Sequence, residues 1–220
     1  MAMEQGKTVI AVLIVLACFI VVLCLYLWRL AVRLDRLHRR VLSTSWALDR
    51  ALVKRAATSL QVADFGFLPL EAATDLARAA KAALAVVDVP VYVDQLRSPI
   101  LLSNQSTLSN QSILSPKPLV DKAETQRAKL VERLLIESEL SRVIRGIVEE
   151  STKEWFRADE VGAPLLGEFQ MACYKVQVAR RLYNQDVRQV HYLRQKLLVR
   201  LFHLAGHAAL PDFVDLDDET

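Results

Sequence analysis

An uninterrupted apolar run near the N-terminus constrains this chain more than any other feature. Between Lys7 and Arg29 stand 21 residues without a charge, TVIAVLIVLACFIVVLCLYLW. As an α-helix the run is about 31 Å long, enough to cross a hydrocarbon core of about 30 Å. The rings of Tyr26 and Trp28 stand at one end, where a membrane interface favours them. The sequence therefore predicts a transmembrane helix over residues 8–28.

Two features separate this run from a cleaved signal peptide. A signal peptide has an apolar core of about 7–15 residues, which follows a basic segment and ends at a site of small residues. Here the preceding segment, MAMEQGK, is close to neutral, and the run ends in a cluster of Tyr, Trp and Arg. We therefore expect an uncleaved anchor.

The charges that flank the run predict which way the chain faces. Five arginines lie within the twelve residues after it, whereas only Lys7 and the amino terminus are positive before it. Positive flanks are retained on the cytoplasmic side of a membrane. We expect a single-pass protein of the cell membrane, with residues 1–7 outside and residues 29–220 in the cytoplasm.

Four of these arginines also share one side of the expected helix, because they are spaced three or four residues apart. Beside a membrane, such a row can contact anionic lipid headgroups, at about 1 kcal/mol for each residue. The alternative is a topology signal with no further role, and both interpretations can hold together. The expected headgroup contacts are Arg29, Arg33, Arg36 and Arg40.

The cysteines and the charge pattern exclude two classes of protein. Cys18 and Cys24 lie inside the span, so Cys173 is the one thiol of the remaining chain. This excludes a disulfide scaffold and suits a reducing compartment. The chain has no basic patch interleaved with aromatic residues, and its last segment, PDFVDLDDET, is acidic. Nucleic acid is therefore not expected as a partner.

Helical periodicity dominates the rest of the chain. Apolar residues recur at intervals of three, four and seven, as in the stripe of an amphipathic helix or a coiled coil, and Gly or Pro separates the segments. No convincing alternating run is present, so the expected fold class is all-α, a transmembrane helix that continues into an antiparallel bundle of long helices. The expected helices cover residues 30–63, 69–87, 121–158 and 165–204.

The expected chain organisation has four parts: a short N-terminus at residues 1–7, the span at 8–28, the bundle at 29–210 and an acidic tail at 211–220. Inside the bundle, residues 88–119 hold four prolines and the tandem repeat SNQSTL-SNQSIL, which favours an irregular surface loop. Asp121 and Glu124 are spaced as a capping box, which predicts the start of the third helix.

Each expected helix has an apolar seam that should face the bundle core. The seam of the first helix is expected at Leu30, Leu34, Leu37, Val41, Leu48, Leu52, Ala56 and Leu60. The seam of the third is expected at Leu130, Leu134, Ile136, Leu140, Val143, Ile147 and Val148. The seam of the last is expected at Phe169, Cys173, Val176, Ala179, Tyr183, Val187, Val190, Leu193, Leu197 and Leu201.

Two motifs resemble a known family. The first helix bears WALDRALVKR, the last bears ARRLYNQDV, and the ending LFHLAGH precedes an acidic tail. With the short N-terminus and single span, these segments are similar to the LemA family of membrane-anchored bacterial proteins, over about two-thirds of the chain. Differences in the segments that follow both motifs resemble a divergent, actinobacterial branch. The resemblance implies a long helical bundle and no established enzymatic activity.

Polar residues of the two motifs form the first candidate site. Asp49 belongs to the first motif, and Arg180, Tyr183 and Asn184 belong to the second. If their helices pack together, these groups can form a buried network that sets the register between the helices. A partner-binding patch is the alternative interpretation.

A weaker pattern in the third helix resembles the Nudix box, which holds Mg²⁺ against a pyrophosphate. Glu137, Arg145, Glu149 and Glu150 match its carboxylates and its arginine, but its two glycines and one glutamate are replaced by Val131, Thr152 and Gly146. The box also requires a loop–helix–loop within a mixed α/β fold. A metal-dependent hydrolase is therefore only the alternative function, and a solvated helix face explains these carboxylates more simply.

The two histidines near the C-terminal end of the last helix are a candidate metal site. His203 and His207 are four residues apart, a spacing suited to zinc, and Asp212 or Asp215 could supply a third ligand. However, Gly206 lies between the histidines, where the helix is expected to end. Histidines beside the negative end of a helix need no metal, so no metal or cofactor is expected.

These patterns together favour a membrane-anchored, cytoplasm-facing interaction or scaffold protein, and not an enzyme. Its expected partners are the lipid bilayer and an unidentified protein of the membrane or cytoplasm. Association with further copies of the same chain is left open.

Overall fold

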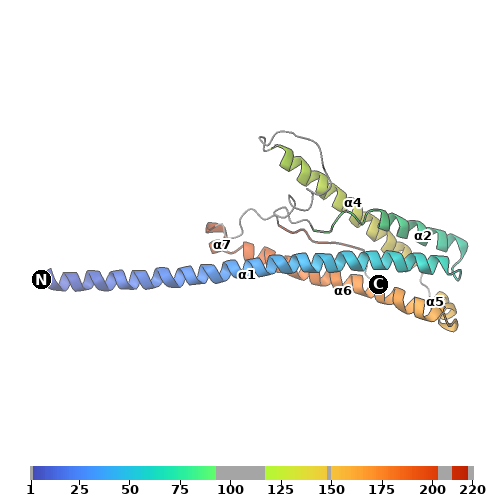
Figure 1. The fold of residues 1–220 in the computed structure, drawn as a ribbon, viewed down its shortest axis with the longest axis horizontal. Helices are drawn as coiled ribbons and strands as arrows, with labels where there is room; N and C mark the ends of the chain where they lie inside the picture. The colour runs from blue at the N-terminus through green and yellow to red at the C-terminus, as the bar shows by residue number, and fades with distance from the viewer. Residues whose placement is uncertain (1, 93–116, 148–149, 203–209, 218–220) are drawn as a thin grey trace, which may run out of the picture.

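The computed structural model describes residues 2–92, 117–147, 150–202 and 210–217 (Figure 1). Within these ranges the regular structure is helical throughout, with no strand. The predicted all-α fold is therefore confirmed.

One helix joins the apolar run to the bundle. Helix α1 (Ala2–Asp64) is continuous over 63 residues, about 95 Å at the rise of an α-helix, and its N-terminal part projects beyond the other helices (Figure 1). It ends just before Gly66, whose φ of 90° lies in the left-handed region that a glycine reaches without strain. The predicted continuation of the span into the first bundle helix is confirmed.

The other helices fold back along the C-terminal half of α1 (Figure 1). Helix α6 (Gly162–Arg194) packs antiparallel to α1, as ion pairs from Arg40 to Asp186 and from Lys54 to Glu168 show. Helix α2 (Leu70–Ala85) also packs on α1, and α4 (Lys117–Ile147) packs on α2. Two short helices, α5 (Glu150–Ala158) and α7 (Leu197–Leu201), adjoin the two ends of α6.

Three predicted helix limits are corrected. Helix α4 begins at Lys117, before the proposed capping box, because a proline such as Pro118 is tolerated in a first helical turn. The third helix ends at Ile147, and α5 is assigned separately after residues 148–149. The last helix stops at Arg194, where the backbone N–H of Lys196 bonds to Leu193 O in a tight turn before α7.

Helix α6 begins three residues earlier than predicted, directly after a turn that the side chain of Asp159 holds. The Oδ1 atom of Asp159 accepts the backbone N–H groups of Val161 and Gly162 at 2.9 and 2.7 Å. A Cβ at Gly162 would stand 2.9 Å from Phe156 O and 3.2 Å from the Phe67 ring, so glycine permits this close approach. The rings of Phe65, Phe67 and Phe156 pack together at this end of the bundle.

The apolar core has two parts. The cluster nearer the apolar part of α1 joins α1 from Leu30 to Leu52, α6 from Val176 to Leu193, and two tail residues, Val214 and Leu216. The cluster further from it joins the end of α1 to α2, α4, α5 and the start of α6. The polar contacts described next lie near the junction of these two clusters and along the tail.

Candidate functional site

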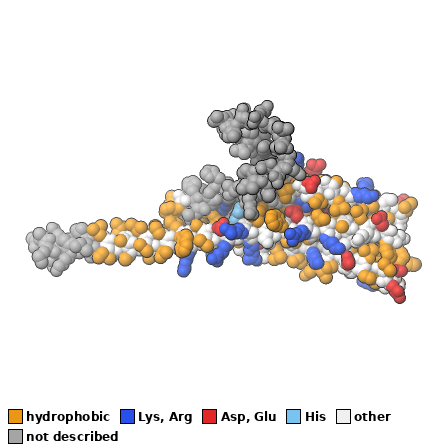
Figure 2. Space-filling model, in the orientation of Figure 1, with side chains coloured by type: hydrophobic (Ala, Val, Ile, Leu, Met, Phe, Trp, Pro, Cys, Tyr) orange, Lys and Arg blue, Asp and Glu red, His pale blue; other side chains and the backbone are white. Residues whose placement is uncertain are grey.

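The N-terminal part of α1 has no protein around it. Every side chain from Leu13 to Arg29 is exposed or half-exposed, and Figure 2 shows this segment as an apolar rod outside the bundle. Among the described residues, one helix is long and apolar enough to cross a membrane, and this rod is its apolar end. Exposure of apolar side chains to water is unfavourable, and no protein covers these. Insertion of the rod into a bilayer would bury them.

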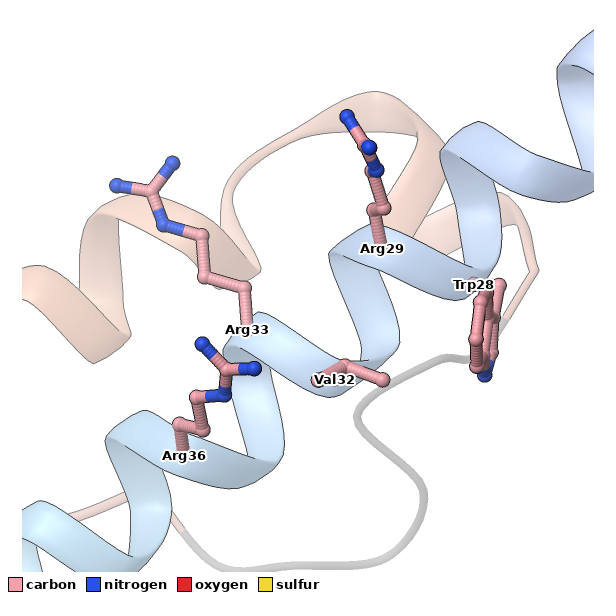
Figure 3. Close-up of a pocket in the computed structure, with 5 residues that line it drawn as sticks. All are labelled: Trp28, Arg29, Val32, Arg33 and Arg36. Carbon is pink, nitrogen blue, oxygen red and sulfur yellow. The ribbon is translucent and has the colours of Figure 1, made fainter.

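Arginines surround the point where the rod meets the bundle. Trp28, Arg29, Val32, Arg33 and Arg36 line an open depression of about 620 Å³. In Figure 3 the three arginine side chains extend from successive turns of α1 on the side away from the Trp28 ring. Three guanidinium groups and one aromatic ring therefore lie on different sides of the same short stretch of α1, a set suited to anionic headgroups at a membrane interface.

Arg40 differs from the other three arginines of the predicted row. Its Nε lies 3.1 Å from Oδ1 of Asp186, whose side chain is only 2% exposed. The pair joins α1 to α6, so Arg40 serves the packing of the bundle. Sequence reasoning grouped Arg40 with the headgroup contacts because residue spacing along one helix does not reveal a partner on another helix, here Asp186.

Helix α7 adds apolar side chains at the same end of the bundle. Leu197, Leu201 and Phe202 are exposed. Val199 is buried in the same core cluster as Leu30, which directly follows Arg29. The exposed side chains therefore lie close to the expected membrane surface. Sequence reasoning missed this role because it placed Leu197 and Leu201 on the core seam of an unbroken helix.

Asp49 is part of a buried contact, but with a partner that the sequence did not suggest. Its Oδ1 lies 2.7 Å from Nη1 of Arg133 on α4 and accepts the backbone N–H of Val91 at 3.4 Å. Nη1 of Arg133 also donates to Val89 O. Burial raises the pKa of Asp49 above 3.8, and the charge of Arg133 opposes this rise only in part.

A second charged pair joins α1 and α4 further from the membrane. Nη2 of Arg55 lies 2.8 Å from Oε2 of Glu137, and Nη1 of Arg55 donates to the hydroxyl of Ser141, also at 2.8 Å. The side chains of Arg55 and Glu137 are 3% and 2% exposed. Glu137 therefore faces the protein interior, bound to an arginine, and not a solvent cavity as a Nudix-type metal ligand would.

Of the remaining residues of the Nudix-like pattern, the structure describes the side chain of Arg145 alone. Arg145 lies on α4 and pairs with Asp217 at 2.6 Å. Glu149 and the side chain of Glu150 lie outside the described residues. His203 and His207 also lie outside them, while Asp212 pairs with Arg127 and Asp215 is exposed. Among the described residues, no group of three or more His, Cys, Asp or Glu side chains is placed to hold a metal ion.

Tyr183 and Asn184 bind the C-terminal tail. The Tyr183 hydroxyl donates to Asp212 O at 3.0 Å, and Nδ2 of Asn184 donates to Val214 O at 2.8 Å. Oδ1 of Asn184 accepts the backbone N–H of Val214 at 2.9 Å. Burial raises the pKa of Tyr183 well above its ordinary value, so the phenol remains a donor.

The tail runs between α4 and α6, and its side chains alternate between protein and solvent from Val214 to Asp217. Val214 and Leu216 are 1% and 2% exposed, whereas Asp215 between them is exposed. Nε2 of His191 lies 2.9 Å from Pro211 O, and the His191 ring packs on Phe213. The acidic tail therefore also contributes two apolar residues, Val214 and Leu216, to the core.

The predicted network of four residues is only partly assembled. Asp49 is near enough to Tyr183 for its charge to contribute to the raised pKa of the phenol. Arg180 is half-buried on α6. The principal partners are nevertheless elsewhere, since Asp49 binds Arg133 and Asn184 binds the tail.

Cys173 shows no sign of a reactive thiol. Burial raises its pKa from 9.0 to about 11, which the charge of Arg55 only partly opposes. A nucleophilic cysteine requires the opposite shift, toward neutral pH.

Comparison with known proteins places the chain in no class. No family model matches it, and no curated protein and no solved structure matches it. The resemblance to the LemA family therefore stays a prediction from the two sequence motifs.

Proposed function

We propose that this chain is a membrane-anchored interaction module, in which α1 spans the cell membrane and holds a helical bundle at its cytoplasmic surface. The observation that carries the proposal is the continuity of α1 from an uncovered apolar rod into the bundle core. A rigid connection of this kind fixes the distance and orientation of the bundle relative to the bilayer. The arginine and tryptophan side chains at the junction support a headgroup contact.

Two further observations support an interaction role for the bundle. Its buried charged groups include pairs between helices, as in Arg55–Glu137, Asp49–Arg133 and Arg40–Asp186. Glu137, the first carboxylate of the hydrolase alternative, is one of these buried partners. The resemblance to the LemA family is a second, independent reason to expect no enzymatic activity.

The first prediction concerns orientation. A fluorescent reporter that folds only in the cytoplasm, fused after Thr220 and expressed in bacterial cells, should be bright, because the arginines after the span hold that flank inside. A phosphatase reporter that is active only outside the cytoplasm should be inactive at the same position. The control fuses both reporters before Met1, where their activities should reverse. An active phosphatase after Thr220 would contradict the proposed orientation.

The second prediction concerns the arginines at the junction. The full chain, extracted from vesicles of phosphatidylcholine and phosphatidylglycerol, should retain phosphatidylglycerol preferentially when bound lipid is counted by native mass spectrometry. Replacing Arg29, Arg33 and Arg36 by glutamine should abolish this preference, at about fivefold in affinity for each charge near the surface. High salt should weaken retention by the unchanged chain as well.

A matched variant separates this local effect from a change in net charge. Arg50→Gln, Arg78→Gln and Arg181→Gln also remove three positive charges, from exposed positions on the bundle. This triple variant should retain phosphatidylglycerol like the unchanged chain. Equal losses in both triple variants would show that the junction has no special affinity for anionic lipid.

A further inference from the structure

The last described residues of the chain are held in the manner of a bound peptide. Residues 210–217 are extended, and alternate side chains at Val214 and Leu216 are buried while Asp215 points to solvent. The contacts come from two helices, so the tail lies along a surface formed by α4 and α6.

Asn184 contacts the backbone of the tail and not its side chains. Its amide group donates to Val214 O and accepts from Val214 N, the pair of bonds that a neighbouring β-strand would supply. Tyr183 and His191 likewise contact the backbone oxygens of Asp212 and Pro211. Such contacts require an extended backbone but accept many sequences, as in other modes of extended-peptide recognition.

The side chains of the tail that contact the protein define a simple pattern. Two apolar side chains, two positions apart, are buried. Acidic side chains flank them, and Asp212 and Asp217 pair with Arg127 and Arg145 of α4 at 3.6 and 2.6 Å. The hydrogen bond from Arg145, together with its charge, lowers the pKa of Asp217 below 3.8, so this carboxylate is ionised at neutral pH.

We propose that this surface is a binding site for an extended acidic segment of a partner protein, and that the chain's own tail occupies it until the partner displaces it. The tail site consists of Ser138 and Arg145 of α4 and of Tyr183, Asn184 and His191 of α6. The partner segment carries two apolar residues two positions apart between acidic residues. The inference rests on the proposed interaction role, to which it adds the chemistry of the partner.

The contacts of the tail are suited to exchange. Both of its ion pairs with α4 involve side chains that are partly or largely exposed, and such pairs contribute little. The pairs of helices α1–α6, α1–α2 and α2–α4 contact one another without the tail. Because the tail is tethered to its site, its high effective concentration can make it an efficient competitor although its ion pairs are weak.

The test compares the full chain with a chain that ends at residue 209, both in nanodiscs. The probe is a fluorescein-labelled peptide of residues 210–220, LPDFVDLDDET, followed by fluorescence anisotropy. The truncated chain should bind the peptide, and the full chain should bind it at least about tenfold more weakly because its own tail competes. A second peptide, SEAIEIE, keeps the pattern but not the sequence and should also bind the truncated chain.

Matched variants show whether the peptide occupies the proposed site. In the truncated chain, Asn184→Asp should weaken binding at least about tenfold, because the carboxylate repels Val214 O, whereas the neighbouring exposed Gln185→Ala should leave it unchanged. In the peptide, Val214→Asp should abolish binding, and Asp215→Asn should have an effect of about twofold or less.

Four outcomes would overturn the inference. They are a truncated chain that does not fold, a folded truncated chain that does not bind the peptide, a full chain that binds as well as the truncated one, and binding restricted to the native sequence. Crosslinks between the tail of one copy and the tail site of another would instead identify a second copy as the occupant. Peptide binding does not depend on the junction arginines, so it can fail or succeed independently of the lipid and orientation tests.

Discussion

Replacing Glu137 with alanine is expected to lower the free energy of unfolding by about 3–5 kcal/mol. Glu137 is 1% exposed, and its carboxylate binds the guanidinium of Arg55 at 2.8 Å. Without it, Arg55 keeps its charge in the core and retains, among the described residues, Ser141 and the backbone oxygen at position 137 as acceptors. The loss is large because the remaining charge is uncompensated, not because the pair itself is strongly stabilising.

Thermal unfolding of the full chain in detergent, followed by circular dichroism, measures this effect. A loss of this size corresponds to a decrease in Tm of about 10 °C for a domain of this length. The control is Glu139→Ala, which removes a carboxylate two residues away whose partner, Arg142, is exposed on the same helix. That variant should change the free energy of unfolding by less than about 0.5 kcal/mol.

A double variant tests the physical reason for the effect. Arg55→Met combined with Glu137→Leu removes both charges and keeps similar volumes, so it should recover most of the stability lost in Glu137→Ala. If the double variant is as unstable as the single one, packing and not the uncompensated charge causes the loss. If Glu137→Ala unfolds like the unchanged chain, the buried pair does not form.

Hydrophobic periodicity was sufficient to predict the central pair of helices. On α1, seven of the eight expected seam residues are buried, and Leu60 is half-buried. On α6, the seam from Phe169 to Leu193 faces α1 or the core. Leu197 and Leu201 fall off this seam because α6 ends at Arg194, a turn that no glycine or proline marks in the sequence.

Helix α4 was harder to predict because its buried face carries charges. The fully buried row is Arg133, Glu137, Leu140, Ser141 and Ile144, whereas the apolar residues Leu134, Ile136 and Val143 are only half-buried. A search for an apolar stripe therefore finds Leu140 and residues that pack at the edge of the core, and it misses the charged residues at the centre of the buried face. The spacing of Arg133 and Glu137, four apart and in step with Leu140, is the signal that could have found it.

The partners of the polar residues depend on contacts that local patterns do not contain. Asp49 and Arg133 are separated by α2 and by a long connection, so their register follows from the packing of three helices. Asp186 is a charged residue inside an apolar seam, next to Val187, which could have identified it as a buried partner. In the tail, the alternation of Val214, Asp215 and Leu216 is a short strand-like pattern, but the acidic composition pointed to solvent.

Replacing Asp49 with alanine is the second large effect expected. Arg133 is 1% exposed, and its Nε and Nη2 atoms have no hydrogen-bond partner among the described residues. Removing Asp49 leaves Arg133 with Val89 O as its remaining acceptor. We expect a loss of about 2–3 kcal/mol, less than for Glu137 because the Asp49 side chain is 23% exposed and water can replace part of its contact.

The pKa of Asp49 is raised, and this explains why the Asp49–Arg133 pair should define the register between α1 and α4 more than it stabilises the fold. Burial raises the pKa of Asp49 although Arg133 lies 2.7 Å away, so desolvation costs the carboxylate more than its partner returns. Replacing both residues by leucine should therefore restore stability lost in Asp49→Ala, since no buried charge then remains. The melting temperature of the two variants in detergent measures this, and the tail peptide provides a second readout. If Asp49→Ala melts like the unchanged chain but changes peptide binding by the truncated chain, Asp49 belongs to a binding surface, and the register interpretation is wrong.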